Sequence, residues 1–443
     1  MNTSAVKRFF KAIVAAVIVL TTAACAEDRS KILKVYNWGD YIDEDLLGEF
    51  EEWYQEQTGE EVKVIYQTFD INETMLSKIE KGHEDFDVVC PSDYIIERML
   101  NGGMLLPLDF ASLPEEINYI YKYRSPYIEK MFRSINPNID ANDYSAAYMW
   151  GTTGILYNAK YVADEDATTW NIIKNQKYAG KIFMKDACRD VYCPINILLH
   201  QDQIAAGEVT MDELMMDSSD ESLAAFEAYM ADVKPLVAGW EADFGKEQMT
   251  QERGWLNFTW SGDAMWAMIE AKDLDVDLRY TVPNEGSNVW FDGWVIPKYA
   301  KNVKAASYFI NFLCRPDVAI RNMEYIGYVS AVASPEVLES MSDEEENPET
   351  VNARYFFGDI EGAEAAHLDP VYYPDSTTIA RCVMMRDWGD ETPKLIAAWS
   401  RVKGSNANVL TIVVICVFVL ALAAFALNKS LGKKKRKSRS GRR

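Results

Sequence analysis

The sequence predicts an α/β protein in which helices cover a mostly parallel sheet. Between residues 32 and 101, strand-like and helix-like segments alternate with short connections, which is the pattern of such a sheet. The composition, with 49% apolar and 12% aromatic residues, provides a sizeable core. The length of 443 residues leaves room for two ordinary domains.

Apolar periodicity places the individual elements. Strands are expected at 32–37, 62–69, 86–92 and 146–158, at 181–191 as a strand that runs into a turn, and as two strands within 278–297. Helices are expected at 43–57, 73–81, 95–101, 222–233 and 304–314, and 254–271 is expected to form a strand, a turn at Gly262 and a helix. Ligands of such sheets bind outside the carboxyl ends of the strands, so the turns that follow the strands are the place to look for a site.

Both ends of the chain have the character of targeting segments. Residues 1–26 have a basic start, an apolar run and then small residues, the pattern of a secretory signal peptide. Two processing outcomes are compatible with this segment. Ala24-Cys25-Ala26 is a site for ordinary cleavage, whereas Thr22–Cys25 is similar to a lipobox in which Cys25 would be lipidated.

A second apolar segment, Val409–Leu427, carries no charge and has the length of a transmembrane helix, which takes about 20 residues. The tail at 428–443 is basic, and positive residues favour the cytoplasmic side of a membrane. We therefore expect the body on the outer face of the membrane, anchored by this helix, with a cytoplasmic tail.

Charge and residue usage exclude several classes of function. A formal net charge of −23 argues against nucleic acid as a partner and favours cations near the surface. None of the histidines, His83, His200 and His367, falls in a strand-end turn, which argues against a metal centre or histidine-based catalysis. We expect no cofactor and no enzymatic activity. Cys188 and Cys193 are close enough for a disulfide, although a buried apolar role is the simpler expectation.

The turns after the predicted strands repeat one composition, in which aromatic side chains lie next to carboxylates. They are NWGDY at 37–41, PSDY at 91–94, KDACRD at 185–190, TWSGD at 259–263, VWFDGW at 289–294 and IGYVS at 326–330. Gly39 is expected to let the first of these segments turn tightly.

This composition suits an organic cation. An alkyl ammonium ligand needs carboxylates at its charged ends and aromatic faces along its apolar length. A cation–π contact contributes about 0.5–2 kcal/mol and a charged hydrogen bond about 1.5–3 kcal/mol. Taken alone, each motif also fits a core tryptophan or a helix-capping aspartate, and Asp263 is a candidate cap. The hypothesis therefore depends on the turns converging in space.

The motifs also occur in the order found in a known family. NWGDY, FDVVCPSDY, YMWGTTGILYN, DACRDV, TWSGDA, VWFDGWVIP, NFLCRPDVA and YIGYVS together resemble the spermidine/putrescine-binding proteins of bacterial ABC transporters. The similarity runs from about Lys31 to Lys403. It implies a two-lobed periplasmic-binding-protein fold of class II, whose lobes close around a ligand by a hinge motion.

The resemblance also implies lobe boundaries and ligand contacts. Lobe 1 is expected to hold 31–140 and 293–330, and lobe 2 to hold 141–292 and 331–403. The candidate ligand-binding residues are Trp38, Asp40, Tyr41, Tyr94, Asp186, Asp190, Trp260, Asp263, Trp290, Asp292 and Tyr328. Asp292 is implied to hold an ammonium group, and Asp263 and Asp40 are similar to the putrescine-preferring branch of the family.

The function implied by the resemblance is that of an extracytoplasmic solute-binding protein of the bacterial cytoplasmic membrane. It would capture putrescine or spermidine and deliver it to ABC transporter permease subunits. Two alternatives remain open. One is a membrane-tethered polyamine sensor, and the other is a sugar-binding or glycoside-processing protein, because sugars also stack on tryptophan and bind aspartate. The C-terminal membrane helix departs from the family's usual forms, which are free in the periplasm or held by an N-terminal lipid.

Overall fold

The structure, a computed structural model, describes residues 28–110 and 113–404. It divides into two compact units, one that ends at Ile396 and one that begins at Ala397. All strands of the described residues and all residues of the predicted ligand site lie in the first unit. The predicted signal peptide with Cys25, the predicted span 409–427 and the basic tail lie outside the described residues.

One part of the expected fold class is corrected. Within residues 28–110 and 113–404, no helix is both long enough and apolar enough to cross a membrane. The last described helix, α18 (Thr392–Lys403), is short and carries Arg401 and Lys403 in its final turn. The part of the expected fold class that the described residues show is the two-lobed α/β fold, and the predicted span 409–427 lies outside them.

The first lobe is built from strands and helices that alternate as expected. Strand β1 pairs in parallel with both β2 and β3, and the helices between these strands follow the predicted order. The elements are β1 (Ile32–Trp38), α2 (Asp45–Thr58), β2 (Lys63–Phe69), α3 (Asn72–Glu80), β3 (Val88–Val89) and α4 (Asp93–Asn101).

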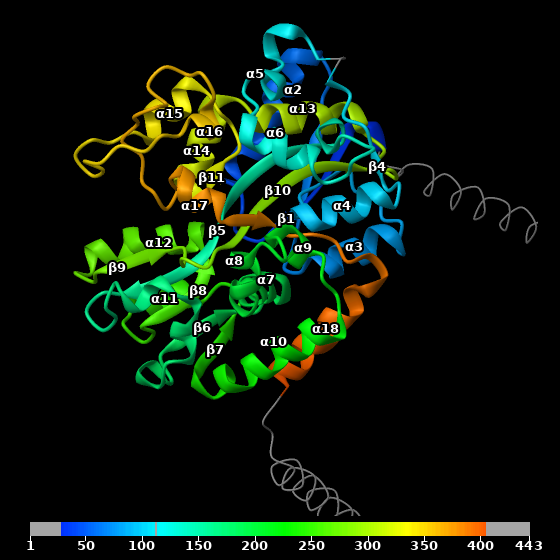
Figure 1. Cartoon of the computed structure of the whole chain (residues 1–443). Helices are drawn as coiled ribbons and strands as arrows, with labels where there is room; N and C mark the ends of the chain where they lie inside the picture. The colour runs from blue at the N-terminus through cyan, green and yellow to red at the C-terminus, as the bar shows by residue number, and fades with distance from the viewer. Residues whose placement is uncertain (1–27, 111–112, 405–443) are drawn as a thin grey trace, which may run out of the picture. The chain divides into compact units, whose positions relative to one another are not determined.

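The second lobe repeats the parallel arrangement at the other end of the sheet. Strand β6 (Ile182–Lys185) pairs in parallel with β7 (Val237–Glu241) and with β8 (Leu256–Trp260). Helix α12 (Ser261–Asp273) continues directly from β8 and packs beside it (Figure 1). Helix α7 (Cys188–Leu199) follows β6 after a short turn.

Two long strands join the lobes. Strands β5 (Ser145–Asn158) and β10 (Ser287–Pro297) are antiparallel to each other and almost entirely buried. The main path of the sheet is β2-β1-β3-β10-β5-β8-β6-β7. The expected parallel pairing therefore holds at the two ends, whereas the middle of the sheet is antiparallel.

Short strands and further helices complete the described residues. The short strands are β4 (Leu105–Leu106), β9 (Leu278–Thr281), β11 (Val329–Ser330) and β12 (Cys382–Met384). The remaining helices are α5 (Tyr119–Lys122), α6 (Pro126–Arg133), α8 (Gln201–Ala206), α9 (Met211–Met215), α10 (Asp220–Val233), α11 (Gly245–Thr250), α13 (Val303–Leu313), α14 (Pro316–Ile326), α15 (Pro335–Met341), α16 (Arg354–Phe357) and α17 (Ser376–Ala380). The boundaries given above for the two lobes stay a prediction.

The cysteines of the described residues are unpaired. Cys90, Cys188, Cys193, Cys314 and Cys382 are all free thiols. The sequence neighbours Cys188 and Cys193 therefore form no disulfide, and Cys193 is buried in the core beside apolar residues.

An aromatic stack holds the joining strands in place. Trp150 on β5 is 1% exposed and stacks on Phe356 of α16, with ring centroids 5.1 Å apart. It also lies nearly parallel to Phe291 of β10 at 6.3 Å. Close packing of these rings fixes which face of β10 points into the core.

We predict that Trp150→Ala lowers the free energy of unfolding by about 3–5 kcal/mol, because it leaves a cavity in this stack. Chemical denaturation of the two proteins measures the difference. Tyr325→Ala is the matched control, since Tyr325 is 66% exposed and should change stability little. A loss no larger for Trp150→Ala than for Tyr325→Ala would show that the stack does not carry this stability.

Candidate functional site

Strand β10 carries the centre of the candidate site. Because side chains alternate between the faces of a strand, Asn288, Trp290 and Asp292 share one face, and Phe291 points into the aromatic stack on the other. Residues 288 and 292 are about 13 Å apart along the strand. This face therefore places an indole between two polar side chains.

Asp292 is a buried carboxyl with neutral partners. It is 7% exposed and accepts hydrogen bonds from Ser92 Oγ at 2.7 Å and from Tyr41 OH at 2.8 Å. Burial raises the pKa of Asp292 from 3.8 to about 6; the two hydroxyl donors lower it, and the negative charge of Asp190 raises it. Within residues 28–110 and 113–404, no lysine or arginine forms an ion pair with this carboxyl.

Asp190 is a second buried carboxyl, in the first turn of α7. It accepts hydrogen bonds from Trp260 Nε1 at 2.9 Å and from Asn288 Nδ2 at 3.4 Å. Burial raises the pKa of Asp190, while these two donors and the more distant Lys185 lower it. Asn288 Oδ1 is buried without a hydrogen-bond partner among the described residues. This end of the site therefore presents the Asp190 carboxylate and Asn288 Oδ1 as hydrogen-bond acceptors.

Asp93 is a third buried carboxyl, and sequence reasoning did not select it. It begins α4, is 1% exposed, and accepts from the backbone N–H groups of Tyr94 at 2.7 Å and Phe291 at 3.3 Å. Burial raises the pKa of Asp93 well above its usual value, and the charges of Asp292 and Asp190 raise it further. The three carboxyls thus oppose each other's ionisation.

Aromatic rings pack in series beside these carboxyls. Tyr41 meets Tyr328 edge-on with centroids 5.2 Å apart, and Tyr328 lies 5.7 Å from Trp290. Gly151 stands opposite Trp290 in the β5–β10 pair, where a Cβ atom would come within 2.6 Å of the indole. A glycine is therefore required for the indole to lie against β5. Trp290 Nε1 is buried and has no acceptor among the described residues.

The carboxyl of Asp263 is already paired with a lysine. Lys185 Nζ contacts Asp263 Oδ2, lies 3.2 Å from Glu241 Oε1, and is 4.2 Å from the centroid of the Trp260 ring. Asp263 also accepts a hydrogen bond from Tyr328 OH at 2.7 Å. Burial acts to lower the pKa of Lys185, but the two carboxylates outweigh it and raise that pKa, so the lysine is charged.

Tyr94 is joined to the site through a hydrogen-bond chain. Asn72 Nδ2 donates to Tyr94 OH and to Ser92 Oγ, both at 3.0 Å, and Ser92 in turn donates to Asp292. The guanidinium carbon of Arg189 lies 4.4 Å from the centroid of the Tyr94 ring. An internal cation therefore covers one face of this ring.

Three predicted residues lie farther out. Trp38, at the end of β1, is half-buried against Phe69 with ring centroids 4.5 Å apart. Asp40 and Asp186 are exposed. In the first turn, Asp40 and not Gly39 has the left-handed backbone conformation, at φ +51°. Aspartate tolerates this conformation better than most residues.

The contacts described above bring together most of the predicted site. They link Tyr41, Tyr94, Asp190, Trp260, Asp263, Trp290, Asp292 and Tyr328. Sequence reasoning did not select Ser92, Asp93, Lys185 and Asn288. The first three belong to the turns singled out by composition, and the signal for Asn288 is its spacing of two from Trp290 on a strand.

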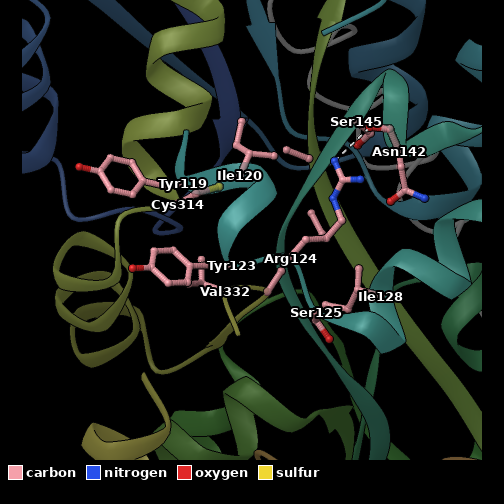
Figure 2. Close-up of a pocket in the computed structure, with 13 residues that line it drawn as sticks. Tyr119, Ile120, Tyr123, Arg124, Ser125, Ile128, Asn142, Ser145, Cys314 and Val332 are labelled. Carbon is pink, nitrogen blue, oxygen red and sulfur yellow. Dashed lines mark hydrogen bonds between the residues drawn. The ribbon is translucent and has the colours of Figure 1, made fainter. Parts of the chain in front are cut away.

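A small pocket lies elsewhere in the first unit and lacks the features of a cation site. Arg124 and Asn142 line it (Figure 2), and Arg124 Nη2 donates to the Asn142 carbonyl at a distance of 3.4 Å. None of the predicted site residues lines this pocket. A guanidinium in its wall would repel an ammonium ligand.

The family of the chain is shown by comparison with known proteins. The sequence profile described as bacterial extracellular solute-binding protein matches residues 50–349. The chain belongs to this family. The expectation of a binding protein and not an enzyme is confirmed by its relatives, which are named as binding proteins. The description of the family places its members outside the cytoplasm.

Two relatives from Escherichia coli cover most of the chain. The spermidine/putrescine-binding periplasmic protein is 30% identical over 78% of this chain and 89% of its own length. The putrescine-binding periplasmic protein PotF is 29% identical over 77% of this chain and 89% of its own length.

A solved structure shares the fold. It is the spermidine/putrescine ABC transporter substrate-binding protein PotD from Streptococcus pneumoniae, with a TM-score of 0.62 and 29% identity. The match covers 84% of this chain and 99% of that one.

We predict that Asp292→Asn stabilises the ligand-free protein at pH 7.5 by about 3 kcal/mol, the equivalent of a pKa raised from 3.8 to about 6. The folded state disfavours the ionised carboxylate, so the native protein loses stability as the pH rises through about 6. The amide does not ionise and can still bond both hydroxyls.

Denaturation of both proteins between pH 4 and 8, after bound amines are removed by unfolding and refolding, measures this difference. The gap between the two proteins should close near pH 4, where the carboxyl is protonated in the folded state. A gap that is the same at every pH would contradict the assignment.

Proposed function

We propose that this protein captures a polyamine between its lobes in the periplasm and delivers it to the permease of an ABC transporter. The observation that carries the proposal is the pair of buried carboxyls, Asp190 and Asp292, at the two ends of the β10 face that presents Trp290. Among the described residues, neither carboxyl forms an ion pair with a lysine or arginine. A ligand with an ammonium group at each end would supply both missing charges.

The protein donors around these carboxyls leave some of their hydrogen-bond acceptor positions unused. A carboxylate has about four acceptor positions, and Asp292 uses two of them for Ser92 and Tyr41. An ammonium ion brings three donors, and each hydrogen bond to a charged group contributes about 1.5–3 kcal/mol. The buried Asn288 Oδ1 offers one more acceptor beside Asp190.

The aromatic series suits the apolar part of a polyamine. Methylene groups between the two ammonium ions would pack against Trp290, Tyr41 and Tyr328, and an ammonium near a ring face gains about 0.5–2 kcal/mol. Trp260 is held by its hydrogen bond to Asp190 and adds a face at that end.

Some of the other predicted residues would contact the ligand, and one would act through its neighbours. Trp38, Asp40 and Asp186 would approach the ligand from the outer side as the lobes close, and Tyr94 would act through Asn72 and Ser92. We propose that closure occurs by a hinge in the strands that join the lobes.

The relatives support the ligand class and the partner. The two Escherichia coli proteins are named for binding putrescine or spermidine in the periplasm, and the Streptococcus pneumoniae protein is named as a substrate-binding protein of a spermidine/putrescine ABC transporter. Their names include both polyamines, so they support the class without selecting one member.

We predict that the full-length protein binds putrescine or spermidine with a dissociation constant in the micromolar range or below, because two buried carboxylates gain counter-ions at once. Calorimetric titration with putrescine, spermidine, spermine and maltose tests this. No binding of any amine, or binding of maltose alone, would overturn the proposed function.

Within the same assay, Asp292→Asn is expected to weaken polyamine binding at least tenfold, because the ligand loses a charged partner. Asp369→Asn is the matched control. Asp369 is also a partly buried carboxyl whose pKa is raised by burial, and it lies outside the site, where it accepts from the Val371 N–H at 2.8 Å. Equal effects of the two substitutions would reject Asp292 as the ammonium partner.

A further inference from the structure

Lys185 occupies a position that the sequence assigned to the ligand. Asp263 was expected to bind a ligand ammonium and Trp260 to provide a ring face. In the structure both are engaged by the Lys185 ammonium, which pairs with Asp263 and lies 4.2 Å from the Trp260 centroid. The geometry is that of an ammonium ligand in a cage of one aromatic ring and two carboxylates, except that the ammonium belongs to the protein.

Several buried hydrogen bonds and ion pairs fix the Lys185 ammonium in this position. Its Nζ also donates to the Ala242 carbonyl at 2.9 Å, and it lies 3.2 Å from Glu241. Glu241 is itself fixed by the Gly245 N–H at 3.0 Å. The side chains of Lys185, Glu241 and Asp263 are 1%, 0% and 5% exposed. Separating this set would leave buried charges unpaired, which is strongly unfavourable.

We propose that Lys185 is a built-in cation that fills the Asp263 position, so that the site takes a diamine and disfavours triamines and tetramines. This inference rests on the proposed function. The diamine would place one ammonium at Asp190 and the other at Asp292. A third ammonium would find the Asp263 carboxylate already paired with Lys185 and hydrogen-bonded to Tyr328 OH, so it would be buried without a carboxylate partner of its own, which is unfavourable.

A second internal cation, Arg189, lies against another aromatic ring that was predicted to contact the ligand. The Arg189 guanidinium covers the Tyr94 ring at 4.4 Å and donates to the Arg386 carbonyl at 2.9 Å. It therefore occupies another of the predicted aromatic faces. Of the predicted carboxylates that are buried, Asp190 and Asp292 remain without an internal ion pair among the described residues.

The double variant Lys185→Met/Glu241→Gln tests the role of the lysine at constant charge. The native set has one positive and two negative charges, and the variant keeps Asp263 as a single negative charge. Asp263 then becomes available to a ligand. Glu241→Gln alone is the matched control, because it retains the pair of Lys185 with Asp263. Addition of Asp263→Asn to the double variant removes the new subsite.

Titration of these full-length proteins with putrescine and spermidine gives the result. We expect the native protein and Glu241→Gln to prefer putrescine at least tenfold. In the double variant, the ratio of spermidine affinity to putrescine affinity should rise at least tenfold. In the triple variant, this ratio should return to the native value. A folded double variant with the native ratio, or a native protein that prefers spermidine, would overturn the inference. Absence of any polyamine binding by the native protein would instead overturn the proposed function.

A ligand series on the native protein tests the inference if the double variant fails to fold. N-propylputrescine has nearly the length of spermidine but lacks its terminal ammonium. If Lys185 leaves no carboxylate for a third ammonium, N-propylputrescine binds more tightly than spermidine. Tighter binding of spermidine would show that a third ammonium is accepted, and the inference would be rejected.

Discussion

The site is defined by the burial of carboxyls without internal counter-ions. Asp190 and Asp292 accept hydrogen bonds only from neutral indole, amide and hydroxyl groups of the described residues. Burial makes their ionised forms costly, which raises the pKa of both groups. Under the proposed function, a cationic ligand would relieve this cost when it binds, so part of its affinity would come from the unfavourable burial of these carboxylates in the ligand-free protein.

The fold determines where these carboxyls lie. Strand β10 has a core face, on which Phe291 packs beside Trp150, and a site face, which presents Asn288, Trp290 and Asp292. A slip of one residue in the pairing of β10 with β5 would exchange the two faces, so the aromatic stack also fixes the register of the site. Because β10 also pairs with β3, at Val295 and Val89, its site face lies beside the turn that carries Ser92.

Local patterns predicted the first lobe well, and for a physical reason. Alternating strands and helices with short connections form parallel pairs with their neighbours, and β1, β2 and β3 do so. The antiparallel crossing of β5 and β10 was not predicted, since it joins segments that are far apart in the sequence. The expected transmembrane helix was not part of the fold of the described residues.

In the site too, local sequence patterns were predictable and contacts between distant segments were not. Trp290 and Asp292 were recognisable from the aromatic and acidic composition of VWFDGW and from its resemblance to the family motif, although the segment lies within β10 and not in a turn. The pairing of Lys185 with Asp263 and Glu241 was not, because it depends on β6, β7 and β8 lying side by side. Asp93 was read as one member of a turn, and its burial follows from the contact of α4 with β10. Whether a carboxylate is paired with a protein cation therefore depends on the tertiary structure around it, and a sequence motif does not show it.

Proton release on ligand binding measures whether Asp292 is a buried carboxyl that gains its counter-ion from the ligand. At pH 6, near the raised pKa of Asp292, a large fraction of this carboxyl is protonated in the free protein. Calorimetric titration with putrescine at pH 6, in two buffers that differ in ionisation enthalpy, counts the protons exchanged. We expect binding to release protons, and Asp292→Asn to release fewer. A binding heat that is the same in both buffers would contradict this expectation.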